Sequence, residues 1–234
     1  MDAMESIIKN LDWSPLFISL KTGIVATFIS FFLGIYAARK VVKTTPGKKA
    51  VIDGILTLPM VLPPTAAGFF LLLLFSRRRP FGILLYEQFG IKVVQTWAGC
   101  IIAATVIAFP LMYRNARAAF EQVDVNLIYA GQTLGMSDRK IFWKVIVPAA
   151  GPGIASGTVL AFARAIGEYG ATSMLAGNIL GKTRTVSVAI AAETSAGNYD
   201  VAGFWVVVIV VISFAIVALI NIVSGRGMKS RRWI

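Results

Sequence analysis

Five long windows almost free of charge dominate this chain of 234 residues and restrict the folds open to it. Windows of about 17–25 apolar residues are long enough to cross a bilayer as helices. Only 15% of the residues are charged, against about 25% in a typical soluble domain. We therefore predict an all-α integral membrane protein with about five transmembrane helices. The predicted spans are Pro15–Ala38, Gly54–Ser76, Val93–Tyr113, Val145–Ala163 and Val201–Gly225, of which only the first contains a charge, Lys21, close enough to one end to snorkel.

Basic residues are unevenly divided between the segments that connect these windows, and this division sets the orientation. If the N-terminus is outside, the inner segments hold 14 basic residues and the outer segments hold 7 besides Arg164, which directly follows the fourth window. The positive-inside rule therefore favours an N-out, C-in topology in the cytoplasmic membrane of a prokaryote. The net charge of +12 then reflects topology, and we expect no nucleic acid partner. The expected organisation is an external segment at 1–14, one membrane domain at 15–225 and a short basic cytoplasmic tail at 226–234.

Two of the windows carry residues that favour contact with other protein. The second contains Pro59, Pro63 and Pro64, each of which frees a carbonyl and kinks the helix. Lipid tolerates such kinks only where neighbouring groups satisfy the freed carbonyls. The fourth is rich in small residues that let helices approach closely. Between it and the last window, the weakly apolar pieces Tyr169–Leu180 and Thr185–Ala192 are candidates for short helices.

A polar run between the third and fourth windows predicts a helix, a sharp turn and a second helix. Asp124 can cap a helix that begins near Val125, and Gly135 can end it in the left-handed conformation. Ser137 can cap the next helix, which we expect to continue until Pro148 perturbs it. Such a short amphipathic element lies on lipid or docks into a partner's groove, and local physics alone leaves both open.

A resemblance to a known protein family favours docking of this element into a partner's groove. Tyr129-Ala130-Gly131, then Gly135, then Val145-Ile146-Val147-Pro148, is similar to the signature Glu-Ala-Ala, three residues, Gly, nine residues, Ile-x-Leu-Pro. That signature marks the membrane subunits of binding-protein-dependent ABC importers of the type I fold. The spacing is kept, but Tyr129 stands where the family usually has Glu, and Gly131 where it has Ala. No salt bridge from that Glu is therefore expected.

Further segments resemble the molybdate permease branch of this family, which is close to the sulfate permeases. They occur in order over roughly residues 14 to 224. They read LFISLKTGIVAT, LPMVLPPTAAGFFLLLLFSRRRPFG, FPLMYRNARAAFEQVD, TLGM, VLAFARAIGEYGAT and AGNILGKTRT.

The resemblance implies a permease that moves an oxyanion by alternating access. It implies a homodimer of this subunit in membrane lipid, two cytoplasmic ATPase subunits and an external oxyanion-binding protein. The region Tyr129–Lys140 would be the coupling helix. The sequence lacks the phosphate-binding pattern GxxxxGK[ST], so ATP and Mg²⁺ are expected on the partner ATPase, with no cofactor on this chain. The expected coupling residues are Tyr129, Ala130, Gly131, Thr133, Leu134, Gly135, Met136, Ser137 and Pro148.

Candidate contacts of the substrate lie at the predicted outer mouth. Arg164 and Glu168 are one helical turn apart and can pair, either as a structural link or as a charge pair beside the pathway. The family's Gly-Glu-Phe/Tyr-Gly-Ala-Thr segment falls here and would contact the binding protein or an external gate. The remaining candidates are the kink with Pro63, Pro64 and Thr65, the hydrogen-bonding side chains Thr172, Ser173 and Asn178, and a basic loop of Arg77, Arg78 and Arg79. That loop suits either lipid headgroups or docking and steering of oxyanions.

Other classes fit the sequence less well. Sulfate or tungstate share the charge and shape of molybdate and stay open as substrates. An ion-coupled transporter or channel usually carries acidic residues inside its spans, and the clean windows hold none. The chain has no histidine and no clustered carboxylates, which argues against a membrane enzyme and a metal site. Cys100, the single cysteine, is expected to be structural.

Overall fold

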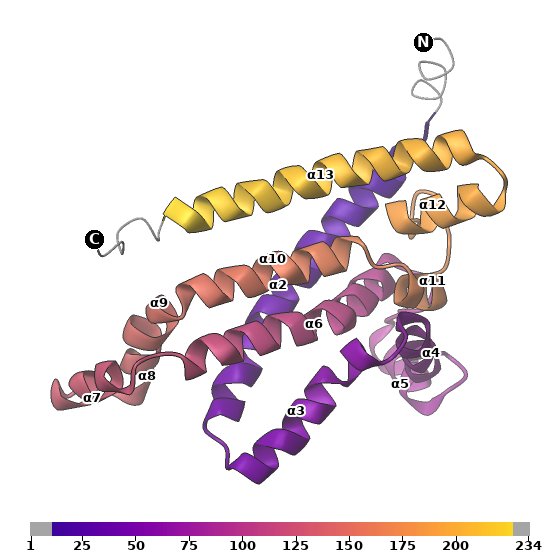
Figure 1. Cartoon of the computed structure of the whole chain (residues 1–234). Helices are drawn as coiled ribbons and strands as arrows, with labels where there is room; N and C mark the ends of the chain where they lie inside the picture. The colour runs from indigo at the N-terminus through magenta and orange to yellow at the C-terminus, as the bar shows by residue number, and fades with distance from the viewer. Residues whose placement is uncertain (1–10, 227–234) are drawn as a thin grey trace.

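The computed structural model describes residues 11–226, and every regular element in that range is helical. The expected external segment 1–14 and tail 226–234 fall mostly outside the described residues. Figure 1 shows the elements in chain order. They are α2 (Ser14–Val42), α3 (Pro46–Val61), α4 (Pro64–Phe75), α5 (Pro80–Phe89), α6 (Trp97–Glu121), α7 (Val125–Thr133), α8 (Asp138–Ile141), the π-helical turn η1 (Phe142–Ile146), α9 (Val147–Ala149), α10 (Gly151–Ile166), α11 (Gly170–Ala176), α12 (Val186–Ser195) and α13 (Tyr199–Arg226).

Three helices among the described residues are long and apolar enough to cross a membrane unbroken, namely α2, α6 and α13. They contain most of the first, third and fifth predicted windows. The third differs at both ends, because residues before Trp97 form a turn in which Gln95 has φ of 57°. At the other end α6 continues to Glu121, well beyond the predicted limit at Tyr113. The polar residues there are helical because one face stays packed, with Ala116, Ala119 and Phe120 buried.

The other two windows are bent spans. α3 and α4 meet at 106°, and the segment Asp138–Ala149 meets α10 at 71°. The first bend confirms the kink predicted at Pro63 and Pro64, whereas Pro59 lies inside α3. Counting each bent pair as one span gives up to five, the number predicted.

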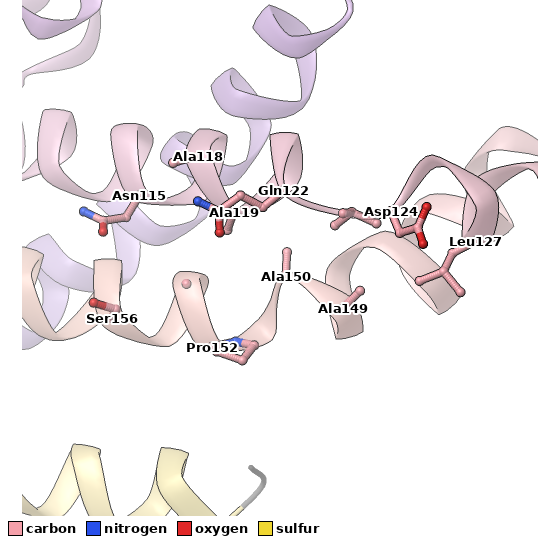
Figure 2. Close-up of a pocket in the computed structure, with 12 residues that line it drawn as sticks. Asn115, Ala118, Ala119, Gln122, Asp124, Leu127, Ala149, Ala150, Pro152 and Ser156 are labelled. Carbon is pink, nitrogen blue, oxygen red and sulfur yellow. The ribbon is translucent and has the colours of Figure 1, made fainter. Parts of the chain in front are cut away.

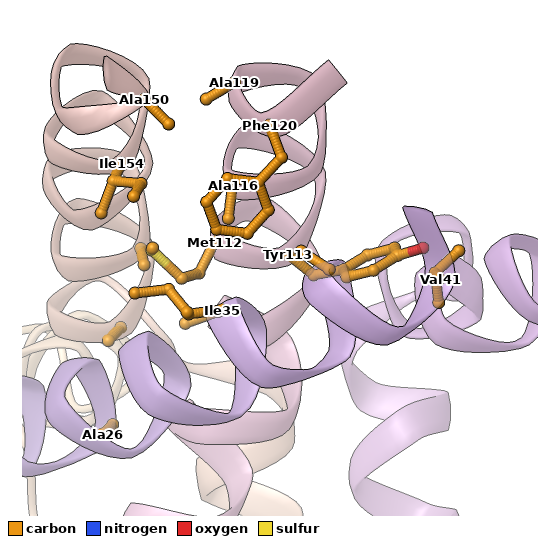
Figure 3. Packing of buried hydrophobic residues seen from close by; sticks show 14 of the residues in the cluster. Ala26, Ile35, Val41, Met112, Tyr113, Ala116, Ala119, Phe120, Ala150 and Ile154 are labelled. Carbon is orange, nitrogen blue, oxygen red and sulfur yellow. The ribbon is translucent and has the colours of Figure 1, made fainter. Parts of the chain in front are cut away.

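The core lies where α2, α6 and α10 pack together, and small residues let them do so (Figure 3). Ala26, Ala108 and Ala116 are fully buried there. A Cβ added at Gly153 of α10 would lie 2.5 Å from the Cβ of Ala119 on α6. The close approach predicted for the fourth window is therefore confirmed.

Helix α13 has one packed part and one exposed part. Trp205 is buried with Val186 and Ala189 of α12, while Phe214 on the same helix is 75% exposed. The two short helices predicted between the fourth and fifth windows are present as α11 and α12. Figure 1 shows them at one end of the molecule, near the start of α2, with α7 and α8 at the opposite end. This arrangement agrees with the predicted sides of the connections.

Candidate functional site

The polar run folds as a capped helix followed by a tight turn. The side chain of Asp124 accepts a hydrogen bond of 2.9 Å from the backbone N–H of Asn126, so the predicted N-cap of α7 is confirmed. Gly135 has φ of +70°, and its N–H donates to the carbonyl of Gln132 at 2.9 Å. The N–H of Met136 donates to the carbonyl of Gly131 at 3.0 Å. These two bonds form a Schellman motif that ends α7, with the glycine at the position that needs a positive φ.

The outer surface of this helix–turn–helix is exposed and partly apolar. Tyr129 is 57% exposed and Leu134 is 79% exposed. Ala130, Thr133, Gly135 and Ser137 are exposed as well, and Met136 is half-buried. Apolar side chains presented on a short helix suit insertion into a complementary groove.

Gly131 faces inward, unlike its neighbours. It is buried, and a Cβ at this position would lie 3.1 Å from Cγ1 of Ile141 on α8. Glycine at 131 thus allows α7 and α8 to fold closely against each other.

Two predicted features of the following helix are confirmed only in part. Ser137 stands at the N-cap of α8, but its side chain makes no capping hydrogen bond. Pro148 does not end the helix, because the π-helical turn at Phe142–Ile146 adds a residue before it and Pro148 continues into α9. The break comes instead at Ala150, where Gly151 and Pro152 begin α10. A proline ring clashes with the carbonyl four residues earlier and donates no N–H, so Pro152 restarts the helix in a new direction.

The turn element is attached to the spans through α8 and η1. Phe142 is buried, its ring centroid lies 5.5 Å from that of Phe120 on α6, and the guanidinium of Arg39 on α2 stacks over it at 4.1 Å. Lys43 and Asp138 form an exposed ion pair at 3.4 Å. A force applied to α7 and α8 would therefore reach α2, α6 and α10.

A pocket of about 430 Å³ opens beside this element, between α6 and α10 (Figure 2). Asn115 and Gln122 of α6 and Ser156 of α10 supply polar groups to it, and Ala119 and Ala150 supply apolar ones. Sequence reasoning missed it, although Asn115, Ala119 and Gln122 are spaced to share one helix face.

A charged network joins α3 to α6 near the same end, and it too was missed. Asp53 accepts hydrogen bonds from the hydroxyl of Tyr113 and the guanidinium of Arg117. Arg117 also donates to Glu121 at 3.1 Å, and Glu121 pairs with Lys49. Its only sequence signal was the spacing of Arg117 and Glu121, since Asp53 lies far away in the chain.

At the opposite end, most of the predicted pathway residues come together. The backbone of α11 approaches α4 so closely that a Cβ at Gly170 would lie 2.9 Å from the Cβ of Pro64 and 3.0 Å from the nitrogen of Thr65. Thr172 on α11 is buried, and the hydroxyl of Ser173 donates to the carbonyl of Gly170 at 3.1 Å. Pro63 is the residue just before α4. The proline bend and the segment after α10 are thus neighbours.

The Arg164 and Glu168 side chains pair as predicted, at 2.6 Å. Glu168 is 2% exposed, and its Oε1 accepts from the N–H of Ala171 at 2.7 Å, which caps α11. These contacts favour the structural reading that the sequence left open. Asn178 accepts from Arg184 at 2.7 Å. In the basic loop, Arg77 stacks over Tyr86 at 3.7 Å, and Arg79 precedes α5.

Residues 176–183, AGNILGKT, come close to the phosphate-binding pattern but begin with alanine. That pattern requires a strand before the loop and a helix opening directly from it. Here a helix, α11, precedes the segment, and the next helix, α12, starts only at Val186. Thr183 is buried, and its hydroxyl accepts a hydrogen bond from the N–H of Ile179. The segment therefore lacks the geometry of a nucleotide site. Within residues 11–226 no three metal-binding side chains cluster either.

Comparison with known proteins assigns the family. Residues 30–224 match the family described as the binding-protein-dependent transport system inner membrane component. The chain is 43% identical over 184 residues to the molybdenum transport system permease protein ModB of Escherichia coli strain K12, covering 79% of this chain and 80% of the relative. It is 38% identical over 216 residues to the putative molybdenum transport system permease protein YvgM of Bacillus subtilis strain 168, covering 92% and 95%.

The chain is also similar to a more distant relative and to a solved structure. The sulfate transport system permease protein CysT of Salmonella typhimurium strain LT2 is 31% identical over 209 residues, covering 89% of this chain and 75% of the relative. The fold matches a bacterial ABC transporter involved in the import of the acidic polysaccharide alginate, with a TM-score of 0.78, 15% identity and coverage of 97% of this chain and 83% of that one. By its sequence, the chain belongs to the family of binding-protein-dependent transport system inner membrane components, which are transport subunits rather than enzymes.

Proposed function

We propose that this chain is the permease subunit of an ATP-driven importer for a tetrahedral oxyanion, molybdate, and that it works as a homodimer. The observation that carries the coupling to ATP is the exposed helix–turn–helix of α7 and α8, closed by the Schellman motif at Gly135. The choice of molybdate rests on the relatives at 43% and 38% identity, which are named as molybdenum transport system permease proteins. The sulfate permease at 31% identity makes sulfate the alternative within the family, and tungstate shares the same chemistry.

In this proposal two cytoplasmic ATPase subunits, which bind ATP and Mg²⁺, each receive one copy of α7 and α8 in a groove. Tyr129, Ala130, Thr133 and Leu134 would face that groove, because they are exposed. Gly131 and Gly135 would set the shape of the element, and Met136, Ser137 and Pro148 would link it to α10. Since Tyr129 carries no charge, its contact with the ATPase would use its ring and hydroxyl instead of a salt bridge.

Closure of the ATPases would then move α10 and α6 through Phe142 and switch the dimer between inward-facing and outward-facing states. Inverting the two populations from 1:99 to 99:1 requires a differential binding free energy of about 5.5 kcal/mol. Binding of ATP at two sites is a sufficient source of that energy.

At the outer end, the proposal gives an external oxyanion-binding protein a docking surface on the permease. The candidates are the basic loop Arg77, Arg78 and Arg79 and the joined segments of α4 and α11. The side chain of Ser173 lies in a small pocket with Asn178, at the start of the α11–α12 connection. Hydroxyl and amide donors of this kind can hold an oxyanion weakly, as passage through a membrane requires.

The test of the coupling element is Gly135→Val, assayed in the complex reconstituted with its ATPase and binding protein. A Cβ added at Gly135 meets no atom of this chain within 4 Å, so within the chain the substitution acts through the backbone conformation. A left-handed conformation costs an L-residue roughly 1–2 kcal/mol, and a β-branched one at least that much. We expect loss of substrate-stimulated ATPase activity and of radiolabelled molybdate uptake.

The matched control is Gly90→Val, because Gly90 has φ of +65° and a Cβ added there also meets no atom within 4 Å, but it lies after α5 at the other end. It should leave the stimulation of ATPase activity intact. Coupled activity in Gly135→Val would refute the role of the turn. Uptake driven by an ion gradient without any ATPase would refute the importer and favour a secondary transporter. Competition of molybdate uptake by sulfate and tungstate decides between the oxyanions.

A further inference from the structure

Three lysines from separate parts of the chain line one open pocket at the outer end. Lys21 belongs to α2, Lys92 to the turn before α6, and Lys182 to the connection between α11 and α12. The pocket has a volume of about 680 Å³, within the range of sites that bind small molecules. Among the described residues that line it, none is acidic. The nearest acid along the chain, Asp12, accepts hydrogen bonds from the N–H and hydroxyl of Ser14.

The three segments are held in place by hydrogen bonds between elements. The indole N–H of Trp97 donates to the hydroxyl of Thr22 at 2.9 Å, which fixes α6 to α2. The N–H of Val186 donates to the hydroxyl of Ser19 at 2.7 Å, which fixes the start of α12 to α2. The N–H of Gln95 donates to the carbonyl of Leu175 at 3.1 Å. The lysines therefore project from a framework that exists before any ligand binds.

The position of the pocket along α2 places it in the headgroup layer. A helix of 29 residues is about 44 Å long at 1.5 Å per residue, close to the about 40–45 Å of a bilayer with its headgroups. Lys21 lies about two turns from the start of α2, so its charge reaches the outer interface. Its ammonium group stacks over Trp97 at 3.8 Å, and tryptophan is enriched at this depth.

An apolar stripe runs from the lysines toward the middle of the membrane. Phe17, Ile24 and Phe28 lie on the same face of α2 as Lys21, and they are 67%, 59% and 64% exposed. From Phe17 to Phe28 the helix rises about 16 Å, the depth of one hydrocarbon leaflet. Ile24 and Phe28 also line a groove of about 410 Å³ that α10 and α13 complete with Phe162 and Ile216. A soluble anion would fill the cationic pocket and leave this groove empty.

We propose that the pocket of Lys21, Lys92 and Lys182 binds the phosphate headgroup of an anionic phospholipid of the outer leaflet, whose acyl chain lies in the groove beside Ile24 and Phe28. Lysines bind phosphate as point charges, and three of them leave a net attraction for a monoanionic headgroup. The apolar groove binds the acyl chain of the same lipid. The occupant is thus a lipid, with cationic and apolar contacts on one helix face.

The test is a native mass spectrometry titration of the purified full chain with phosphatidylglycerol, with phosphatidylcholine as the neutral comparison. The test variant is Lys21→Gln, Lys92→Gln and Lys182→Gln combined. Each basic residue near an anionic membrane surface strengthens binding by about fivefold. Loss of three lysine charges should therefore raise the dissociation constant for phosphatidylglycerol on the order of 100-fold. Replacement of the same three residues by arginine should retain binding within about threefold, because the charge is kept.

Two further variants separate the possible occupants. Arg77→Gln, Arg78→Gln and Arg79→Gln combined removes the same charge from the same end and should leave phosphatidylglycerol binding unchanged. Phe28→Ser, at an exposed position in the groove, should weaken phosphatidylglycerol binding without changing the binding of inorganic phosphate or molybdate.

The proposal is overturned if the glutamine variant still binds phosphatidylglycerol, if the arginine-loop variant loses it equally, or if phosphatidylcholine binds as tightly. Inorganic phosphate or molybdate that binds in the pocket and is lost with the lysines, while lipid binding persists, would assign the pocket to a soluble anion. Loss of stimulation by the binding protein with unchanged lipid binding would assign it to protein docking. Both of these results would also overturn the lipid site. The anion and lipid titrations do not depend on the proposed transport function, whereas the stimulation assay does.

Discussion

The network around Asp53 should control how firmly α3 is attached to the rest of the protein. No residue of α3 is buried, and its apolar attachment is limited to the partly buried side chains Ile52 and Leu56. Asp53 and Arg117 have side chains that are 22% and 25% exposed, so water screens their pairing only in part. The substitution Asp53→Asn removes this ion pair and keeps an oxygen that can accept from Tyr113.

The size of the effect lies between two limits. Two unit charges 3 Å apart attract by roughly 5 kcal/mol at an effective dielectric constant of 20, before the cost of desolvation is subtracted. Breaking a fully buried pair costs about 3–5 kcal/mol, and breaking an exposed one about 0–1 kcal/mol. For a pair of intermediate burial we expect about 2 kcal/mol, which corresponds to a rise of about 30-fold in the detachment of α3.

The assay is amide hydrogen exchange of the chain in lipid nanodiscs, followed by mass spectrometry. Exchange in the first half of α3 should speed up by about 30-fold in Asp53→Asn, while α10 should not change. The control is Asp138→Asn at the same end, because its partner Lys43 is at 3.4 Å but the two side chains are 61% and 75% exposed. Equal exchange in α3 for the wild type and Asp53→Asn would refute the reasoning and show that Ile52, Leu56 and the remaining Lys49–Glu121 pair suffice.

Two other substitutions test the packing and the outer end. Gly153→Val should lower stability by about 1–3 kcal/mol, because its Cβ would collide with Ala119. A Cβ at Gly151 meets no atom within 4 Å, so Gly151→Val should have a smaller effect. Both effects are measured as the melting temperature in detergent. Glu168→Ala should destabilise α11 by about 1 kcal/mol more than Glu168→Gln, because glutamine keeps an oxygen for the N–H of Ala171. Equal melting temperatures of the two variants would show that Glu168 does not act as a cap.

The sequence was informative wherever a single residue has a strong local effect. Gly135 and Asp124 have conformational preferences that decide a turn and a cap without any neighbour, and both predictions are confirmed. Pro148 does perturb the helix, but the sharp bend comes at Ala150 instead, because a helix can absorb a proline by adding a residue in a π-helical turn. Local preference does not reveal which of two prolines will be absorbed.

Sites assembled from distant segments could not be predicted in this way. Asp53 and Tyr113, or Lys21, Lys92 and Lys182, meet only because the spans cross as they do. From the sequence alone, Lys92, Lys182 and Arg117 contribute only to the count of basic residues that predicts the topology. Lys21 is interpreted only as a side chain that reaches the membrane interface. Their second role depends on which face of each helix they occupy once the core of α2, α6 and α10 has formed.

The two departures from the family signature have different physical causes. Gly131 is buried against Ile141, so the missing methyl group of alanine is a matter of packing inside this chain. Tyr129 is 57% exposed, so burial within this chain does not account for its aromatic ring, and we look for the cause outside the chain. If α7 docks in an ATPase groove as proposed, that groove has to accept a ring at the position where a carboxylate would usually enter. A basic residue there would gain no ion pair, and an apolar or aromatic wall would bury the ring of Tyr129 instead. The two departures therefore concern different properties: Gly131 affects how the turn packs within this chain, and Tyr129 affects what the turn contacts in a partner.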